Sequence, residues 1–278
     1  MKVLAPAKVN IALNVVGKME NGYHELDMIM APISLYDELN IQPIHGSEDI
    51  ILCNGAQLPE KNTIQKSIDL MREKYKFENH YLVEVDKNIP MQAGLAGGSA
   101  DAAAVLKAIN ETEQLMATED DLIELGKRVG ADVPFCLVNQ WARVQGIGEK
   151  IRRLDCDWKF DILLVKPKEG VSTPASFAIW DEKEHKEVDV DIVEEALQHK
   201  NVELLYTTMV NDLEAIGQEL LPVLNTIKED MNDEGIVRVM MSGSGSSMMG
   251  FSVDQDVLEE AKDVLKKKYE FVEVVTVG

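Results

Sequence analysis

The most distinctive segment of the chain is a glycine-rich run that leads directly into a sequence favouring a helix. Its residues are Pro90, Met91, Gln92, Ala93, Gly94, Leu95, Ala96, Gly97, Gly98, Ser99 and Ala100. Glycines allow the backbone to approach an anion closely, and a helix N-terminus adds partial positive charge and backbone N–H donors. A tight strand-to-helix turn without a ligand would use the same residue types. The segment therefore predicts a phosphate-binding loop, with the plain turn as the alternative.

Two common phosphate-binding patterns do not fit this sequence. The Walker A pattern, G-x-x-x-x-G-K-[ST], occurs nowhere along the chain. The run Gly243-Ser244-Gly245 begins like the dinucleotide fingerprint G-x-G-x-x-G, but Met248 stands where the third glycine is required. The glycine-rich run before the helix therefore has to be explained by a different phosphate-binding pattern.

Two charged residues lie in contexts where a catalytic group could act. Lys8 stands at the start of an alternating, strand-like segment, where a lysine usually extends its charged end to solvent. Asp132 lies in Gly130-Ala131-Asp132-Val133-Pro134, where an aspartate could equally cap a helix. Taken singly, each residue is compatible with a structural role as well as with a catalytic one.

The composition excludes several classes of protein. The chain has 278 residues, of which 45% are hydrophobic and 28% charged, a profile typical of one large or two ordinary globular domains. Its formal net charge is −21, so sequence-independent binding to nucleic acid is not expected. An anionic ligand would also be repelled at long range. It therefore needs a local cradle of backbone N–H groups, a lysine and a divalent cation.

Cysteine usage and hydropathy predict a cytoplasmic protein with no membrane partner. The three cysteines, Cys53, Cys136 and Cys156, include no C-x-x-C pair. Reduced thiols are therefore expected, and neither a zinc site nor a disulfide framework is predicted. The segment after Met1 lacks an apolar signal core, and no apolar run approaches the ~20 residues that span a bilayer.

Apolar periodicity predicts a mixed order of strands and helices. Alternation predicts strands over residues 9–16, 81–85, 141–145, 161–165, 236–241, 248–253 and 271–277. Helical spacing predicts helices over residues 62–75, 192–197, 213–231 and 257–269, a helix starting near 101, and another capped by Thr118 with Asp121. Since strands and helices do not alternate steadily, the predicted fold class is α+β. A change in residue composition along the chain predicts two domains, residues 1–155 and 156–278.

Three segments together resemble the GHMP kinases, the superfamily of galactokinase, homoserine kinase, mevalonate kinase and phosphomevalonate kinase. Pro6-Ala7-Lys8-Val9-Asn10 is similar to the first signature of this family, and residues 90–100 are similar to its phosphate loop. Ser242-Gly243-Ser244-Gly245 with Gly250 resembles the third signature. Each motif is weak alone, but they occur in the family's order with sensible gaps.

Further motifs narrow the resemblance to the branch that phosphorylates a cytidine diphosphate-linked methylerythritol. They are Asn21-Gly22-Tyr23-His24, residues 130–135, residues 146–149 and residues 166–173. The resemblance implies ATP as phosphoryl donor, Mg²⁺ brought with it, and a small-molecule substrate. It also implies a two-domain GHMP kinase fold with the active site in the cleft between the domains. The N-terminal domain would resemble domain 2 of ribosomal protein S5, and the C-terminal domain would be ferredoxin-like. A monomer or weak homodimer is expected.

The resemblance also implies roles for individual residues. Residues 90–100 would wrap the ATP phosphates. Asp132 would accept or orient the proton of the attacking hydroxyl, and Lys8 would hold that hydroxyl and offset negative charge. Ser99 is the candidate Mg²⁺ ligand. Asn10 would lie near the substrate diol, with Gly243 and Ser244 shaping the site near substrate and phosphate.

The family holds the cytosine of its substrate with an aromatic sandwich and a histidine. Tyr23 and His24 occupy those positions in this sequence. Phe177 is the expected opposing aromatic, with Trp180 as the alternative.

Several residues depart from the family pattern, among them Ser246-Ser247, which replace a pair that more often contains proline or alanine. Ala100 stands where many members have a second serine. Arg143, in an unusual strand sequence, either touches a phosphate or is a solvated strand residue, and the second interpretation is favoured.

Two other functions remain open at this point. One is a sibling GHMP kinase acting on a mevalonate-like or homoserine-like alcohol, which would have no use for the Tyr23-His24 pair. The other is a catalytically silent nucleotide-binding regulator, which would need the glycine loop but not Lys8 and Asp132.

Overall fold

The protein consists of two compact units built from interleaved segments of the chain. The structure, a computed structural model, describes residues 1–55, 57–59, 61–185 and 188–278. The first unit comprises Met1–Ala7, Leu35–Ile89 and Ala96–Asn139, and the second comprises Lys8–Ser34, Pro90–Leu95 and Gln140–Gly278. Residues 155 and 156 both lie in the second unit. The domain boundary expected between them stays a prediction.

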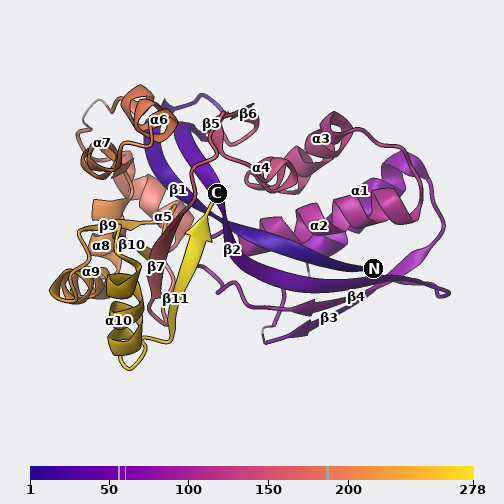
Figure 1. Cartoon of the computed structure of the whole chain (residues 1–278). Helices are drawn as coiled ribbons and strands as arrows, with labels where there is room; N and C mark the ends of the chain where they lie inside the picture. The colour runs from indigo at the N-terminus through magenta and orange to yellow at the C-terminus, as the bar shows by residue number, and fades with distance from the viewer. Residues whose placement is uncertain (56, 60, 186–187) are drawn as a thin grey trace. The chain divides into compact units, whose positions relative to one another are not determined.

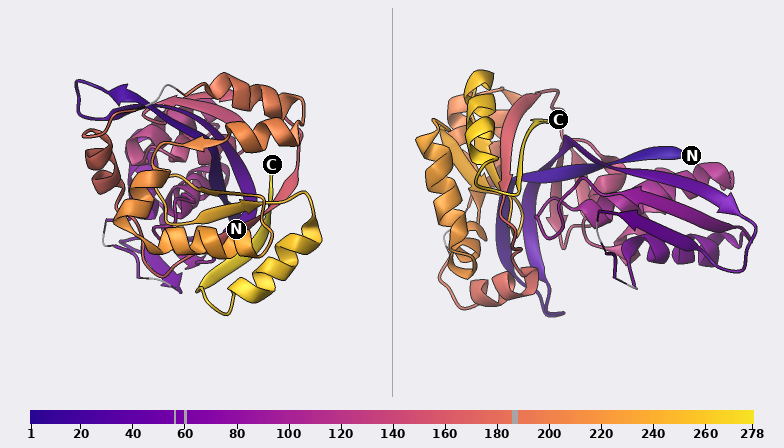
Figure 2. Two further views of the ribbon diagram at one scale, coloured as in Figure 1. Left: turned by 90° about the vertical axis from the view of Figure 1, so that its left-hand side faces the viewer. Right: turned by 90° about the horizontal axis from the view of Figure 1, so that it is seen from below.

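Two long strands contribute to both units. They are β1 (Lys2–Lys18) and β2 (His24–Ile44), which pair with each other. Figures 1 and 2 show them as the two indigo-to-violet ribbons at the start of the chain. The predicted strand over residues 9–16 is therefore confirmed as part of a longer one.

The first unit pairs the C-terminal part of β2 with two further strands and covers one face of them with helices (Figure 1). The strands are β3 (Ile50–Asn54), parallel to β4 (His80–Asp86), and β4, antiparallel to β2. The helices are α1 (Thr63–Tyr75), α2 (Gly97–Thr112), α3 (Glu119–Val129) and α4 (Val133–Val138).

Local signals explain where two of these helices begin. Asn62 caps α1, because its side chain accepts the N–H of Gln65. Thr118 and Asp121 form the capping box predicted for α3, in which each side chain accepts the other residue's backbone N–H.

The second unit is built on an antiparallel sheet ordered β11-β7-β10-β9. These strands are β7 (Phe160–Lys166), β9 (Arg238–Met241), β10 (Met248–Phe251) and β11 (Phe271–Val277). Beside them, β5 (Ala142–Gly146) pairs with β2 and β6 (Lys150–Arg153), and β8 (Val210–Asn211) runs parallel to β1. The order of strands and helices confirms the α+β class.

Helices pack on this sheet and around it. Figure 1 shows α9 and α10 against the sheet, and both contact its strands. The helices of this unit are α5 (Thr173–Trp180), α6 (Val190–Gln198), α7 (Val202–Thr208), α8 (Glu214–Leu220), α9 (Val223–Asp233) and α10 (Gln255–Leu265). The single helix predicted over residues 213–231 is wrong, because α8 ends at Leu220 and a second helix, α9, begins at Val223 with Pro222 at its N-cap position.

No helix in the described part of the chain combines the length and apolar character needed to cross a membrane.

Candidate active site

The ammonium group of Lys8 is buried in the second unit and donates hydrogen bonds to oxygens of Asn10 and Gly94. Lys8 is 4% exposed, and its Nζ donates to Oδ1 of Asn10 at 2.7 Å and to the Gly94 carbonyl oxygen at 3.2 Å. The backbone N–H of Lys8 donates to the carbonyl of Leu95 at 3.1 Å. A lysine extended into solvent is therefore excluded, because this cation is directed at the first half of the glycine-rich segment.

The same half of the segment is bonded to the glycine turn that follows β9. The N–H of Ser246 donates to the Gln92 carbonyl at 3.2 Å, and the N–H of Ser247 donates to the Ala93 carbonyl at 3.1 Å. Residues 90–95 are thus held by backbone hydrogen bonds to a turn about 150 residues later in the chain.

Gly243 and Ser244, both predicted to lie near the substrate, belong to this turn. The side-chain amide of Asn211 donates to the Gly243 carbonyl at 2.8 Å, and the hydroxyls of Ser244 and Thr173 are hydrogen-bonded at 2.6 Å. A Cβ at Gly243 would lie 3.1 Å from the carbonyl oxygen of Gly94. The second unit therefore brings Gly243 against the loop that Lys8 contacts.

His24 is enclosed by one face of α5. Its ring stacks on Phe177 with centroids 4.5 Å apart and an interplanar angle of 18°, and it meets Trp180 edge-on at 5.6 Å. Its Nε2 is 2.7 Å from Oδ1 of Asp181, whose other oxygen accepts a hydrogen bond from Lys18 at 2.5 Å. The predicted residues His24 and Phe177 are thus neighbours.

The two aromatic candidates differ in exposure. Trp180 is 6% exposed and stacks on His185 with centroids 3.6 Å apart, whereas Phe177 is partly exposed. Tyr23 is 61% exposed beside His24 in the chain. Phe177 is therefore the better candidate for stacking against a planar ligand, since Trp180 is already covered.

The second half of the glycine-rich segment forms the start of α2 in the first unit. The N-cap residue is Ala96, which has φ of 59° and no side-chain oxygen, so it makes no side-chain cap hydrogen bond to the first turn. Gly97 and Gly98 follow, and Gly98 is exposed. An exposed helix N-terminus without a capping side chain offers backbone N–H groups and partial positive charge to an anion.

Asp132 lies in the first unit, at the N-cap position of α4. Its side chain makes no cap hydrogen bond to that helix, so capping does not account for this carboxylate. A Cβ at Gly130 would lie 3.9 Å from Oγ of Ser99, which means that the turn carrying Asp132 passes close to Ser99. Asp132 belongs to the first unit, whereas Lys8 belongs to the second.

A buried ion triad supports the first turn of α2. Nζ of Lys87 donates to Asp101 at 2.8 Å and also contacts Asp37, which accepts the backbone N–H groups of Asn88 and Ile89. Burial, opposed by Lys87 and assisted by the neighbouring Asp37, raises the pKa of the Asp101 carboxyl to about 7. The sequence contains no local signal for this triad.

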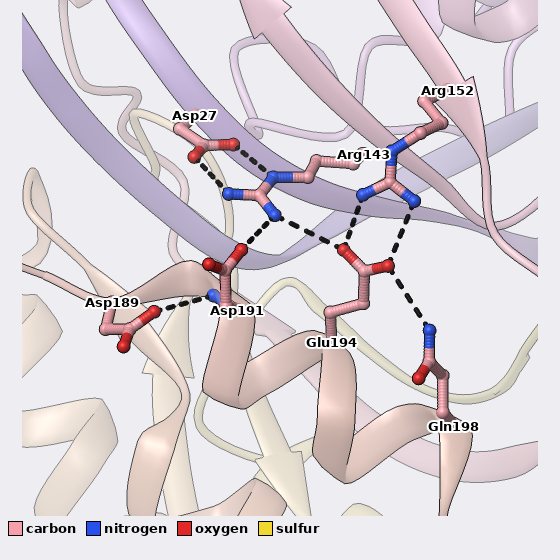
Figure 3. A network of polar contacts seen from close by, with 7 residues as sticks. All are labelled: Asp27, Arg143, Arg152, Asp189, Asp191, Glu194 and Gln198. Atoms are coloured by element: carbon pink, nitrogen blue, oxygen red, sulfur yellow. Dashed lines mark hydrogen bonds and ion pairs between the residues drawn. The ribbon is translucent and has the colours of Figure 1, made fainter.

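Arg143 is bound by three carboxylates, those of Asp27, Asp191 and Glu194. Its Nε and Nη2 form two parallel hydrogen bonds with Asp27 at 2.8 and 2.6 Å (Figure 3). Its Nη1 contacts Asp191 and Glu194 on α6, and Glu194 also binds Arg152. The favoured expectation of a solvated strand residue is wrong, because Arg143 is only 15% exposed and joins α6 to β2 and β5.

Three residues of this site were not singled out by sequence reasoning. Lys18, Asp181 and Asn211 act through partners far away in the chain. Asp181 has one detectable local signal, since it follows Phe177 by four residues and therefore lies on the same face of α5.

Comparison with known families gives matches over both parts of the chain. The model of the GHMP kinase N-terminal domain matches residues 62–140, and the model of the GHMP kinase C-terminal domain matches residues 193–270. The 4-diphosphocytidyl-2-C-methyl-D-erythritol kinase of Lachnospira eligens is 39% identical, with 99% of this chain and 97% of the relative aligned. The kinase of the same name from Acetivibrio thermocellus is 41% identical over 88% of each chain.

Solved structures agree with the sequence matches. A crystal structure of 4-(cytidine 5'-diphospho)-2C-methyl-D-erythritol kinase superposes with a TM-score of 0.84 at 31% identity, covering 100% of this chain and 99% of the other. Homoserine kinase from Cytophaga hutchinsonii superposes with a TM-score of 0.76 at 20% identity, covering 100% and 94%, and indicates a shared fold.

Proposed function

The chain belongs to the 4-diphosphocytidyl-2-C-methyl-D-erythritol kinases within the GHMP kinases, and we propose its reaction and the roles of its residues from that premise. The protein is a kinase that uses ATP. It phosphorylates the 2-hydroxyl of 4-diphosphocytidyl-2-C-methyl-D-erythritol, giving the 2-phosphate and ADP. This is a step of the non-mevalonate route to isoprenoid precursors.

One observation supports the catalytic part of this proposal above the others. The buried Lys8 ammonium contacts the carbonyl of Gly94, inside the glycine-rich segment, and the side chain of Asn10. A buried cation next to a phosphate loop can stabilise negative charge on a transferring phosphoryl group far better than one in water. Lys8 in this proposal also holds the substrate hydroxyl, with Asn10 beside the substrate diol.

Phosphoryl transfer depends mainly on positioning and on stabilising charge on the equatorial oxygens. Residues 90–100 supply backbone N–H groups for this purpose, and the N-terminus of α2 adds the partial charge of the helix. Asp132 accepts or orients the proton of the attacking hydroxyl. A carboxylate side chain is one of the groups that commonly serve as a general base.

Mg²⁺ accompanies ATP in this proposal and neutralises charge on its phosphates. Mg²⁺ in such sites uses one or two protein oxygens, with phosphate oxygens and water completing its shell. The hydroxyl of Ser99, in the first turn of α2, fits this limited protein contribution. Within the described ranges no group of three or more His, Cys, Asp or Glu residues could hold a metal, so a dedicated carboxylate cage is not part of the proposal.

The substrate's cytosine stacks between Tyr23 and Phe177 in this proposal and is hydrogen-bonded by His24. The exposed ring of Tyr23 and the contact of Phe177 with His24 support this assignment. Gly243 and Ser244 line the site near the substrate phosphates. The enzyme works in the cytoplasm as a monomer or weak homodimer, without nucleic acid or membrane partners.

A substrate panel tests the proposed function. Purified protein with Mg·ATP is given the cytidine-linked alcohol, mevalonate or homoserine, and the products are identified by ³¹P NMR. We expect transfer to the cytidine-linked alcohol only, and a raised KM for it in the His24→Ala variant. Transfer to another alcohol instead would favour a sibling kinase, and ATP binding without any transfer would favour a regulator.

A further inference from the structure

Helix α5 presents three side chains to a single imidazole ring. Phe177, Trp180 and Asp181 are spaced i, i+3 and i+4, which places them on one face of a helix. Phe177 stacks on the ring of His24, Trp180 meets its edge, and Asp181 approaches its Nε2 at 2.7 Å. The side chain of His24 is only 8% exposed, so these contacts leave the ring little freedom to turn.

The contact with Asp181 determines which ring nitrogen carries the proton. A carboxylate oxygen only accepts hydrogen bonds, so Nε2 of His24 must be the donor in this pair. In a neutral imidazole the other nitrogen, Nδ1, then has a lone pair and acts as an acceptor. No hydrogen bond to Nδ1 of His24 occurs among the described residues, so this acceptor remains available to a ligand.

Lys18 keeps the carboxylate in its charged, accepting state. Its Nζ donates to Oδ2 of Asp181 while His24 occupies Oδ1. Hydrogen bonds from Lys18 and then from His24 hold the pKa of Asp181 below its ordinary value. Asp181 therefore stays an acceptor over the whole neutral range.

An acceptor at Nδ1 distinguishes the two common pyrimidines. Cytosine carries an amino group on C4, which donates hydrogen bonds, whereas uracil carries a carbonyl oxygen there, which only accepts them. A lone pair on Nδ1 attracts the first group and repels the second.

We propose that Asp181 is a positioning residue that sets the tautomer of His24 and thereby makes the enzyme select a cytidine-linked substrate over its uridine-linked analogue. This inference rests on the proposed function, since it assumes that His24 faces the base of the substrate. Asp181 thus has a role in substrate specificity, in addition to the structural role of its hydrogen bond with His24.

The variant Asp181→Asn tests the proposal with almost no change in shape. Lys18 can only donate, so it favours the asparagine oxygen on its own side and directs the amide NH₂ at His24. Nε2 then has to accept, which moves the ring proton to Nδ1. The double variant Asp181→Asn with Lys18→Met removes this bias, and Lys18→Met alone is the matched control because the carboxylate is retained.

Two measurements are made at pH 8, above the usual titration range of histidine side chains. Nitrogen-15 NMR of the imidazole rings, with His24 assigned by its loss in His24→Gln, gives the tautomer directly. The second measurement is the ratio of kcat/KM for the cytidine-linked substrate to that for the uridine-linked analogue. Removing or reversing one hydrogen bond corresponds to roughly 10- to 100-fold in such a ratio.

We expect the wild type and Lys18→Met to carry the proton on Nε2 and to prefer the cytidine-linked substrate. Asp181→Asn should move the proton toward Nδ1 and reduce the preference by about tenfold or more. A wild-type ring protonated on Nδ1, or an active Asp181→Asn enzyme with an unchanged ratio, overturns the inference but not the proposed function. Wild-type enzyme inactive on both substrates overturns the proposed function, and the inference with it.

Discussion

Gly94 lies so close to Ser242 that a Cβ built on Gly94 would be 2.1 Å from the Ser242 carbonyl oxygen. The hydroxyl of Ser242 also donates to the carbonyl of Gly94 at 3.2 Å. Gly94 has φ of +72°, a left-handed conformation that favours glycine. Two glycine-rich segments that are 148 residues apart in the sequence are thus in contact through their backbones, which explains the absence of a side chain at this position.

Replacing Gly94 by alanine should therefore be strongly destabilising. The left-handed backbone costs about 1 kcal/mol for alanine. The clash with Ser242 adds roughly 1–3 kcal/mol or more, because backbone atoms have to move. We expect a clear decrease in the thermal unfolding temperature and weaker binding of ATP, measured by calorimetry.

Gly22→Ala is the matched control for this prediction. Gly22 has a similar φ of +84°, but a Cβ there would meet nothing within 4 Å. It should therefore lose only the roughly 1 kcal/mol due to the backbone conformation. Equal losses in the two variants would mean that the close approach to Ser242 is unimportant.

Asp132→Asn should abolish most of the catalytic rate. Loss of a general base typically lowers kcat by about 10²–10⁴-fold, while substrate binding, reported by KM, changes much less. Lys8→Met should lower kcat as well, since it removes the buried cation beside Gly94. Single-turnover ADP formation measures the chemical step directly.

The double variant of Lys8 and Asp132 tests whether the two residues act on one step. If both stabilise the same transition state, the combined loss should be far smaller than the product of the single losses. A fully multiplicative loss, or an Asp132→Asn enzyme of nearly normal kcat, would contradict the roles proposed for the pair.

Asp101 should make the stability of the protein depend on pH near neutrality. Its pKa is raised from 3.8 to about 7 in the folded protein, mainly by burial. Between these values the folded state binds a proton that the unfolded state does not, so its contribution to stability falls as pH rises through this interval. Asp101→Asn should remove that trend, and the variant should gain stability relative to the wild type between pH 5 and pH 8.

Asp121→Asn provides the control for this pH dependence. The pKa of Asp121 is lowered to about 2, chiefly by its hydrogen bond with Lys74. Its proton-linked contribution is therefore lost only in acid, well below pH 5. Urea unfolding of the three proteins at several pH values gives the comparison. If the stability of the wild type and of Asp101→Asn changed with pH in the same way, Asp101 would be excluded as the source of the pH dependence.

Arg143→Met should destabilise the second unit by roughly 3 kcal/mol, because Asp27 and Glu194 would keep their charges in a largely buried place. Arg143→Lys should restore only part of this loss, since a lysine cannot form the two parallel bonds to Asp27. Denaturant unfolding measures the loss of stability in both variants.

Arg152→Ala is the control for this prediction. The side chain of Arg152 is 56% exposed, and the loss of stability should be about 1 kcal/mol or less. Similar losses at positions 143 and 152 would contradict this account of the network (Figure 3).

Local sequence signals predicted many of the helices and strands. Alternation along β1 and β11, the helical spacing over residues 62–75 and the capping box of Thr118 with Asp121 depend on neighbours within a few residues, so they are visible in the sequence. The helix α5 was missed because it has only eight residues and carries Pro174 in its first turn. The strand β6 was missed because it is four residues long and largely basic.

In the candidate site, too, some features were predicted from the sequence and others were not. Short sequence motifs were sufficient to predict the family. They are the glycine-rich segments and the segments that contain Lys8, Tyr23-His24 and Asp132. The partners of these residues were not predictable. Asp181 reaches His24 across 157 residues, and Arg143 reaches Asp27 across 116.

The sequence by itself was therefore sufficient to identify the family, and it predicts the phosphate loop and the candidate catalytic residues. Only the tertiary structure decided that Lys8 is buried against Gly94, that Phe177 is partly exposed whereas Trp180 is buried, and that Asp181 contacts Nε2 of His24. The reason is physical. Backbone propensities and caps depend on adjacent residues, whereas the environment of a buried charge or ring depends on segments that only folding brings together.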